Sequence, residues 1–338
     1  MPTKTIAVLH PGEMGAGIGA CLARRGLRVV WASGGRSAAT RARANAAGLE
    51  DLGSIGRALG VADVVLSVCP PHGALALARE VAGHAFGGIY VDANAVSAET
   101  ARSVGRAVEK AGASFVDGGI IGPPPAEAGR SRVYLSGGPA KDLAALFAGS
   151  NLEAIPLEAS AGAASALKAC YAGWTKGATA LLAAIRALAK HEGIEAALLA
   201  EWKLSQPGLE QRSEAVTVQA RKAWRWIGEM EEIAASFEAA GLPGGFHLGA
   251  ADLYRRLGSF KDGTAPPPLA EVMSALMRGA RRKSAPGRSR RGGAPSGEPA
   301  GARFKFGTAA LRRAEVKRSG RERQEGAREK FKFGKRTV

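Results

Sequence analysis

The stretch IAVLHPGEMGAGIG, which spans residues 6–19, passes from an apolar run into a glycine-rich turn and then resumes with helical spacing. This order predicts a strand, a loop and a helix. Glycines in such a loop let the backbone approach a pyrophosphate, and the free N–H groups of the following helix favour its negative charge. Gly12 and Gly15 match the later glycines of the G-x-G-x-x-G pattern, whereas His10 replaces the first. The stretch therefore predicts a dinucleotide-binding loop, and a turn without a ligand is the alternative.

The residues that follow alternate short apolar runs with helical segments as far as about residue 150. Apolar runs that predict further strands lie at residues 28–32, 64–68, 89–92, 114–117 and 133–135. Near-continuous β-branched runs are typical of parallel strands that are buried on both faces. The predicted fold class is α/β, a Rossmann-type doubly wound sheet followed by an all-helical domain and a disordered basic tail. The expected bounds of these three parts are residues 1–158, 159–280 and 281–338.

The turn after the second predicted strand bears on the choice between NAD and NADP. An Asp or Glu at this position would bond to the ribose hydroxyls of NAD and repel a 2′-phosphate, and the turn has neither. It carries Ser33 and Arg36 instead, a hydroxyl and a guanidinium that suit a phosphate. The sequence therefore favours NADP over NAD. The alternative is that Arg36, Arg41 and Arg43 only solvate the exposed face of the next helix.

Several segments resemble the β-hydroxyacid dehydrogenase family, the relatives of 6-phosphogluconate and 3-hydroxyisobutyrate dehydrogenases, in their order and spacing. These segments are GEMG at 12–15, ADVVLSVCP at 62–70, VDAN at 91–94, FVDGGIIG at 115–122, and the helix start that contains Gly162 and Lys168. The resemblance covers roughly residues 4–280, and its second half is most similar to the branch with a phosphogluconate dehydrogenase-like C-terminal domain.

The resemblance implies cofactor contacts from the glycine loop and from the ends of two later strands. The residues concerned are Gly12, Glu13, Met14, Gly15, Val68, Cys69, Pro70 and Asn94. It also implies substrate contacts from Gly118, Gly119, Ile121 and Gly122. Asn94 is expected at the carboxyl end of a strand, where ligands bind in open α/β sheets. A local turn bond is the alternative for this side chain.

In that family the lysine of the helix is the general acid and base, and Lys168 is the matching residue. Hydride transfer between C4 of a nicotinamide and a carbonyl carbon places negative charge on the oxygen, and a nearby ammonium can donate its proton there. Tyr171 joins Lys168 in the predicted catalytic set, as a substitute for one hydrogen bond of an Asn that is common in relatives, whereas Ala172 offers none. A lysine that merely extends from an apolar helix to solvent is the alternative.

The predicted substrate loop departs from the family pattern. Relatives usually carry there a serine that binds the substrate carboxylate, but Ile121 stands at that position and prolines follow at 123–125. The backbone N–H groups of Gly118, Gly119 and Gly122 remain able to bind an oxyanion. The apolar side chain argues for a substrate with a different or bulkier contact.

Beyond residue 161 the apolar pattern becomes helical, with helices expected over 163–192, 195–204, 213–240, 245–258 and 269–281. Lysines and arginines interrupt the first of these, which argues against a membrane span. The family's habit of completing the substrate cleft with a partner's C-terminal domain implies a homodimer, with His247 near the partner's cleft. The three cysteines are expected to be core residues of a reduced, cytoplasmic protein. No spacing of ligands indicates a metal site.

The net charge of +17 is concentrated at the C-terminal end. Residues 281–338 hold 19 Lys and Arg against 5 Asp and Glu, which leaves the preceding 280 residues close to neutral. This Ser-, Gly-, Pro- and Arg-rich tail cannot bury enough apolar surface to fold alone. It is either a basic extension that binds nucleic acid or anionic surfaces, or an extension without a selected function, and the second interpretation is favoured.

Taken together, these features predict an NADP-dependent oxidoreductase that interconverts a small hydroxy acid and its carbonyl form, with or without decarboxylation. A lysine serves as general acid and base. One alternative is a non-catalytic dinucleotide-binding protein with a nucleic-acid-binding tail, which His10, Ile121 and Ala172 leave open. Another is an imine reductase-like enzyme, against which a lysine at the acid position argues.

Overall fold

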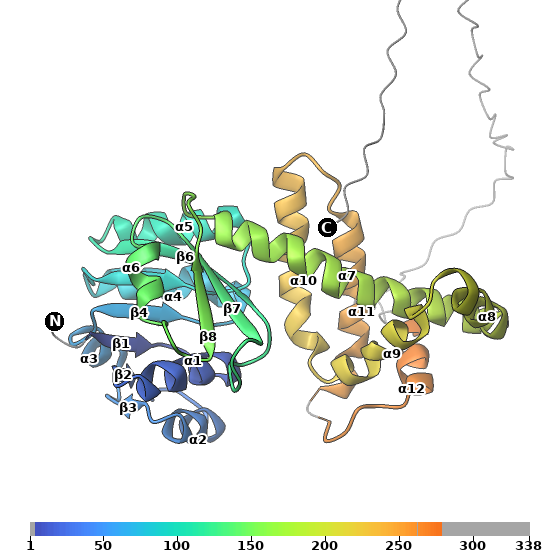
Figure 1. Cartoon of the computed structure of the whole chain (residues 1–338), viewed down its shortest axis with the longest axis horizontal. Coiled ribbons are helices and arrows are strands. Elements are labelled where there is room, and N and C mark those ends of the chain that lie inside the picture. The colour runs from blue at the N-terminus through green and yellow to red at the C-terminus, as the bar shows by residue number, and fades with distance from the viewer. Residues whose placement is uncertain (1–3, 262, 279–338) are drawn as a thin grey trace, which may run out of the picture. The chain divides into compact units, whose positions relative to one another are not determined.

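The computed structural model describes residues 4–261 and 263–278, which belong to one compact unit (Figure 1). The predicted basic tail, residues 281–338, lies outside the described residues.

The first part of the described chain is built around one sheet of eight strands, in the order β3-β2-β1-β4-β5-β6-β7-β8. The strands are β1 (Thr5–Val8), β2 (Arg28–Trp31), β3 (Glu50–Asp51), β4 (Val64–Ser67), β5 (Ile89–Asp92), β6 (Ser114–Ile121), β7 (Ser131–Ser136) and β8 (Leu152–Pro156). Neighbouring strands pair in parallel, except that β6 and β7 are antiparallel. The chain reverses its winding between β1 and β4, and the crevice at the carboxyl ends of such a pair is where ligands bind in this class of fold.

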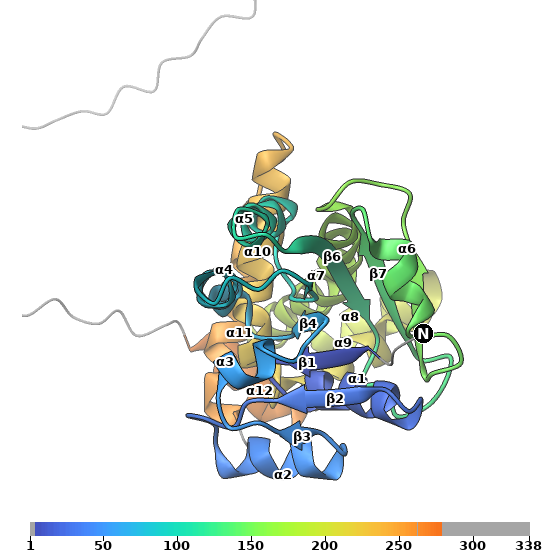
Figure 2. The same ribbon diagram turned by 90° about the vertical axis from the view of Figure 1, so that its left-hand side faces the viewer.

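Helices cover both faces of the sheet, as Figure 2 shows. They are α1 (Glu13–Arg24), α2 (Ala38–Ala46), α3 (Ile55–Leu59), the 3₁₀ helix η1 (Pro71–Gly73), α4 (Ala74–Gly83), α5 (Ala98–Glu109) and α6 (Ala140–Ala145). One buried core joins α1 and α6 to the sheet, and a second joins α3, α4 and α5 to its other face. Because the central strands are apolar on both sides, they fit only between two such layers. This arrangement confirms the predicted Rossmann-type sheet.

The second part is entirely helical within the described residues and begins with the long helix α7 (Ala163–His191). The remaining helices are α8 (Glu195–Ser205), α9 (Leu209–Ala220), η2 (Ala223–Arg225), α10 (Trp226–Ala239), α11 (Gly245–Arg256), η3 (Leu257–Phe260) and α12 (Leu269–Met277). Alanines of α7 pack against larger side chains such as Met230, Ile233 and Tyr254 in one buried core. Small residues on a helix face allow neighbouring helices to approach closely. Figure 1 shows α7 running from the sheet into this bundle.

Three features differ from the sequence predictions. The strand β6 continues through Gly118 to Ile121, where a loop was expected, because these residues pair with residues 132–135 of β7. The short strand β3 and the edge strand β8 were not predicted at all. The single helix expected over 213–240 is two helices, α9 and α10, separated by a turn that contains η2.

Candidate active site

The turn between β1 and α1 exposes backbone N–H groups. Gly12 is the N-terminal cap of α1 and has no side chain, so no side chain caps the first turn. A Cβ atom at Gly12 would meet nothing within 4 Å, whereas one at Gly15 would lie 2.3 Å from the backbone oxygen of His10. The loop itself therefore requires Gly15, and the space beside Gly12 is open. An uncapped helix start of this kind favours a phosphate group, so the turn fits the pyrophosphate of a dinucleotide.

His10 and Arg36 lie near each other beside this turn. Burial, and after it the charge of Arg36, lower the pKa of His10 to about 4, so the imidazole is uncharged at neutral pH. The Nδ1 atom of His10 and the Nε atom of Arg36 are buried and have no hydrogen-bond partner among the described residues. Buried polar atoms without partners are costly. A phosphate bound here would give the Arg36 guanidinium an acceptor.

Ser33 follows β2 and is held by a carboxylate of the neighbouring strand. Its backbone N–H donates to Asp51 Oδ1 at 3.2 Å, and the N–H of Gly53 donates to the same oxygen at 2.8 Å. Asp51 was not predicted to lie at this turn, because it belongs to the unpredicted strand β3 and not to the end of β2. A carboxylate thus lies beside the turn, where two backbone N–H groups already hold it.

The side chain of Asn94 is buried and fully engaged within the protein. Its Oδ1 accepts from the N–H of Cys69 at 2.5 Å, and its Nδ2 donates to Ser67 Oγ at 2.9 Å and to Asp92 Oδ1. Burial, and then the charge of Asp117, raise the pKa of Asp92 to about 7. Asn94 therefore fixes the turn after β4 to the end of β5. The predicted contact of Asn94 with the cofactor stays a prediction.

A cleft of about 240 Å³ opens at the carboxyl ends of β4, β5 and β6, between the sheet and α7. Its lining residues are Met14, Val68, Cys69, Ala93, Asn94, Ala95, Ile120, Gly122, Lys168 and Lys176. The glycine loop, both strand ends and the predicted catalytic lysine thus meet in one place. Of the side chains that line this cleft, those that carry charge are the two lysines, because burial raises the pKa of the Cys69 thiol to about 11.

Both lysines face one carboxylate from the helical bundle. Glu229 of α10 is buried, its Oε1 lies 3.7 Å from Nζ of Lys168, and its Oε2 accepts a hydrogen bond from Nζ of Lys176. Burial is the largest influence on the pKa of Lys176 and lowers it to about 8, although Glu229 opposes the shift. The sequence analysis singled out neither Glu229 nor Lys176. Their relation to Lys168 arises from the packing of α10 on α7, and no local pattern reports such packing.

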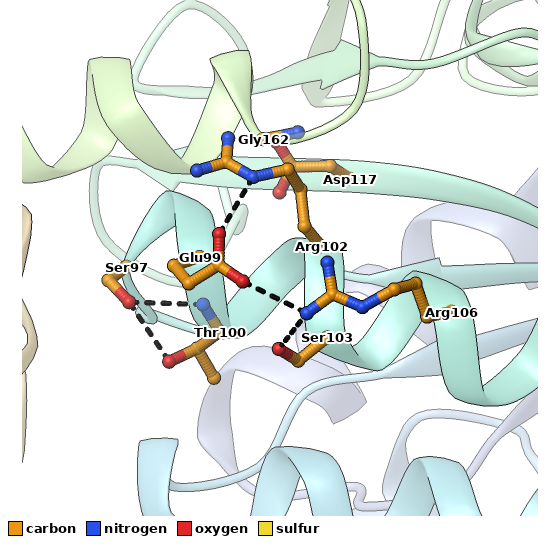
Figure 3. Close-up of polar contacts among 8 residues, drawn as sticks. All are labelled: Ser97, Glu99, Thr100, Arg102, Ser103, Arg106, Asp117 and Gly162. Carbon is orange, nitrogen blue, oxygen red and sulfur yellow. Dashed lines mark hydrogen bonds and ion pairs between the residues drawn. The ribbon is translucent and has the colours of Figure 1, made fainter. Parts of the chain in front are cut away.

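The start of α7, which positions Lys168, is anchored by the buried Asp117 of β6. The Asp117 carboxylate accepts from the backbone N–H groups of Gly162 and Ser165 at 2.9 and 3.0 Å, and from Ser165 Oγ at 2.5 Å. Figure 3 shows Asp117 and Gly162 next to Arg102 of α5. A Cβ atom at Gly119 would lie 2.4 Å from the backbone oxygen of Ala164, so only glycine allows this close approach of β6 and α7.

Polar contacts also join the helical bundle to the helices of the sheet domain. Glu13, the first residue of α1, pairs with Arg225 at 3.0 Å and with Lys222 at 3.3 Å. Glu232 of α10 accepts a hydrogen bond from the N–H of Ser97, at the start of α5, at 2.7 Å. Both contacts border the crevice side of the sheet, because α1 and α5 each begin after the carboxyl end of a strand.

The structure brings together six of the predicted site residues in the cleft, namely Met14, Val68, Cys69, Asn94, Gly122 and Lys168. It does not bring Tyr171 there, because this side chain is half exposed on α7 and is not among the lining residues. His247 is buried between Phe237 and Phe246 and packs on α7. Ile121 is buried, and its neighbour Ile120 lines the cleft instead.

Within the described residues, no helix is long and apolar enough to cross a membrane, and no group of three or more His, Cys, Asp and Glu side chains is placed to hold a metal ion. The expectation of three core cysteines was wrong. Cys21 is buried, Cys69 is partly buried and Cys170 is exposed, because Cys170 lies on the outer side of α7.

Comparison with known families gives two matches. The NAD binding domain of 6-phosphogluconate dehydrogenase matches residues 5–148, and a domain of unknown function (DUF1932) matches residues 189–257. No curated protein matches the chain.

Among solved structures, a conserved protein of unknown function with reported structural similarity to 3-hydroxyacid dehydrogenases is 26% identical, with a TM-score of 0.58 over 75% of this chain and 97% of its own. A conserved hypothetical protein from Sinorhizobium meliloti 1021 is 28% identical, with a TM-score of 0.59 over 82% and 96%. The 3-hydroxyisobutyrate dehydrogenase of Mycobacterium tuberculosis is 22% identical, with a TM-score of 0.60 over 81% and 99%, and shares the fold.

A glycine loop with an uncapped helix start, at the reversal point of a parallel sheet, defines a dinucleotide-binding protein. The chain belongs to the β-hydroxyacid dehydrogenase family. It is an NAD(P)-dependent dehydrogenase or reductase.

Proposed function

We propose that this protein is an NADP-dependent oxidoreductase that interconverts a small hydroxy acid and its carbonyl form, with Lys168 as general acid and base. The observation that carries the proposal is the cleft that joins the glycine loop to Lys168 and whose charged lining side chains are lysines. A cationic cleft of this kind favours an anionic substrate, as a hydroxy acid is near neutral pH.

The chemistry that Lys168 performs follows from its place in the cleft. A bound nicotinamide supplies or accepts the hydride at the substrate carbon. In the direction of reduction, the Lys168 ammonium donates a proton to the carbonyl oxygen as negative charge develops there. In the direction of oxidation, the neutral amine takes the hydroxyl proton. The Glu229 carboxylate, 3.7 Å from Nζ of Lys168, is placed to hold this side chain in the cleft.

The preference for NADP is supported by the turn after β2. The guanidinium of Arg36 has a buried Nε without a partner among the described residues, and Ser33 lies two residues beyond the end of β2. Asp51 opposes a 2′-phosphate, because the hydrogen bonds that it accepts from Ser33 and Gly53 lower its pKa and keep it ionised beside the turn. The support for NADP is therefore the Arg36 guanidinium, to which a 2′-phosphate would supply an acceptor.

A homodimer is supported by exposed apolar side chains on α7. Tyr171, Trp174, Leu181 and Leu188 are each at least 44% exposed, and helical spacing places them along the outer side of one helix. A contiguous exposed apolar surface typically marks an interface, and two identical chains pair most often about a twofold axis.

The activity test is a panel of 2- and 3-hydroxy acids and short aldehydes, followed by the absorbance of NADPH, with carbon dioxide release as the measure of decarboxylation. Lys168→Met should lower kcat by roughly 10²- to 10⁴-fold and leave the affinity for NADPH nearly unchanged, as expected for the loss of a general acid and base. Lys190→Met, at an exposed position of the same helix, is the matched control. Wild-type turnover in the Lys168 variant would show that another group transfers the proton.

A further inference from the structure

Among the described residues, none of those that line the cleft has a side-chain hydroxyl to hold a substrate carboxylate. Ile121 occupies the position at which the serine of related sequences was expected, and its side chain is buried in the sheet. The residues that line the cleft here are Ile120 of β6 and Gly122, which follows the end of this strand. Asn94 also lines it, but its amide bonds to Cys69, Ser67 and Asp92. Among the side chains that line the cleft, those left to pair with a carboxylate are therefore the lysines of α7.

Lys176 lies on that side, about two helical turns beyond Lys168. Its place is well defined, because its backbone carbonyl accepts a hydrogen bond from the Tyr254 hydroxyl at 2.5 Å and its Nζ lies 5.2 Å from the ring centre of Trp226. An ammonium has three N–H donors. Among the described residues, Lys176 donates to a single acceptor, Glu229. Donors therefore remain for a ligand in the cleft.

The positive charges around Glu229 outnumber the negative ones, and the carboxylate of a ligand would make the two equal. Two ammonium groups, those of Lys168 and Lys176, share the single buried carboxylate of Glu229. Buried charges are stable when each is paired and hydrogen-bonded. A second carboxylate next to Lys176 would give two cations and two anions, while Lys168 would stay free to face the reacting oxygen.

We propose that Lys176 binds the carboxylate of the substrate and that Glu229 is the positioning residue that holds Lys176 and Lys168 on opposite sides of one carboxylate. This inference rests on the proposed function, in which Lys168 transfers the proton. It assigns the substrate class more closely, to hydroxy acids whose carboxylate lies against α7 and not against the glycines of β6. It also divides the two lysines by role, one for binding and one for proton transfer.

The proposal implies an exchange of protons on binding. The ionisable groups near Lys176 are Glu229 of α10, Lys168 of α7 and Tyr254 of α11, whose hydroxyl donates to the backbone carbonyl of Lys176. Burial and the charge of Lys168 lower the pKa of Lys176, Glu229 raises it, and the result is a pKa of about 8. A carboxylate beside the ammonium raises this pKa. At pH 8 the protein should then take up a fraction of a proton when an acid binds, and affinity for the acid should fall as the pH rises above that value.

The test measures binding of glycolate, D- and L-lactate, 3-hydroxypropionate and 3-hydroxyisobutyrate, each beside its neutral amide, to full-length protein saturated with NADPH, so that no turnover occurs. Lys176→Met should weaken binding of the tightest acid at least 10-fold and leave binding of the amide unchanged. Lys176→Arg should retain part of the affinity for the acid, and Lys190→Met should retain all of it. Calorimetry at pH 8 in buffers of different ionisation enthalpy should show proton uptake in the wild type and none in Lys176→Met.

Three outcomes would overturn the inference. In the first, no acid binds more tightly than its amide, and in the second, Lys176→Met binds the acid as tightly as the wild type does. In the third, this variant loses affinity for acid and amide equally, which indicates a structural role. Unchanged NADPH affinity of each variant shows that it is folded. A Lys176-dependent preference for acids in a protein that oxidises none of them would instead uphold the binding site and refute the proposed reaction. Turnover that depends on Lys168 but not on Lys176 would uphold the proposed reaction and refute the role of Lys176 in binding the carboxylate.

Discussion

At the scale of single residues, the functional features of this protein are polar atoms that lack partners. Arg36 Nε, His10 Nδ1 and Glu229 Oε1 are all buried without a hydrogen bond among the described residues, and all border the crevice or its cleft. Native proteins pair nearly all such atoms. Other buried atoms of the described residues also lack a partner, among them Trp31 Nε1 and Gln219 Oε1, so these three are distinguished by their place at the crevice.

Arg36 provides the test of cofactor choice. If its guanidinium contacts a 2′-phosphate, NADPH should bind more tightly than NADH by about 1.5–3 kcal/mol, the usual range for a hydrogen bond to a charged group. Arg36→Ala should remove most of this difference, and Arg57→Ala, an exposed arginine of α3, should not. Fluorescence titration with both cofactors measures the effect. Equal affinities of the wild type for the two cofactors would refute the preference for NADP.

Asp92 provides a test of pH dependence. Its pKa rises from 3.8 to about 7 in the folded protein because of burial and the nearby Asp117. Between these values the folded state binds the proton that the unfolded state has lost, so the free energy of unfolding should fall as the pH rises from about 4 to about 7.

Asp92→Asn keeps an oxygen that can accept from Asn94 but cannot ionise. Its urea midpoint should therefore fall less than that of the wild type between pH 5 and pH 8, whereas the exposed Asp142→Asn should follow the wild type. Parallel midpoints for Asp92→Asn and the wild type at all pH values would contradict the raised pKa.

At the scale of elements, the alternation of strands and helices was legible in the sequence because buried parallel strands are almost entirely apolar. The strand character of Gly118 and Gly119 could not be predicted from the sequence, since glycine disfavours strands and indicates turns. Residues 118–121 form a strand because they pair with β7. The break between α9 and α10 was missed because the apolar pattern continues through it.

Some residues of the candidate site could be predicted from the sequence, and others could not. The glycine loop, the ends of β4 and β5, and Lys168 are marked by local patterns, and the cleft contains residues from each of them. Glu229 and Lys176 belong to a set that exists only when α10 packs on α7. The one local signal was the recurrence of lysine on α7, and taken alone it is equally typical of a solvated face.

The outer side of α7 carries the prediction on assembly. Trp174, 64% exposed, should lie in a homodimer interface, so Trp174→Glu should yield monomers at micromolar concentration in light scattering. Val61→Glu, at an exposed apolar position of the sheet domain, should leave the dimer intact. A monomeric wild type would refute the homodimer.

At the scale of the whole molecule, the charge and the enzyme-like part are separable. Of the net charge of +17, the 19 basic and 5 acidic residues of 281–338 supply nearly all. Truncation after Ala280 should therefore yield a protein that folds, binds NADPH and keeps its activity, because the three buried cores lie within the described residues before it.

Any affinity of the full chain for nucleic acid should fall steeply with salt and disappear on truncation, since it would depend on Lys and Arg contacts to phosphates. Filter binding between 50 and 200 mM salt, roughly the range over which such contacts weaken, measures it. Loss of folding in the truncated protein would place the domain boundary further along the chain.

The ion pairs of Glu13 with Arg225 and Lys222 span two bodies, since the carboxylate begins the phosphate-binding helix and both cations belong to the helical bundle. A pyrophosphate that arrives at the same helix start offers those cations a second anion. If these cations change the affinity for the dinucleotide, bound dinucleotide changes the strength of their ion pairs with Glu13 by the same free energy, because linkage is reciprocal. Binding of the dinucleotide and the ion pairs of Glu13 should therefore be coupled, and added salt should weaken both, because all of these charges are near the surface.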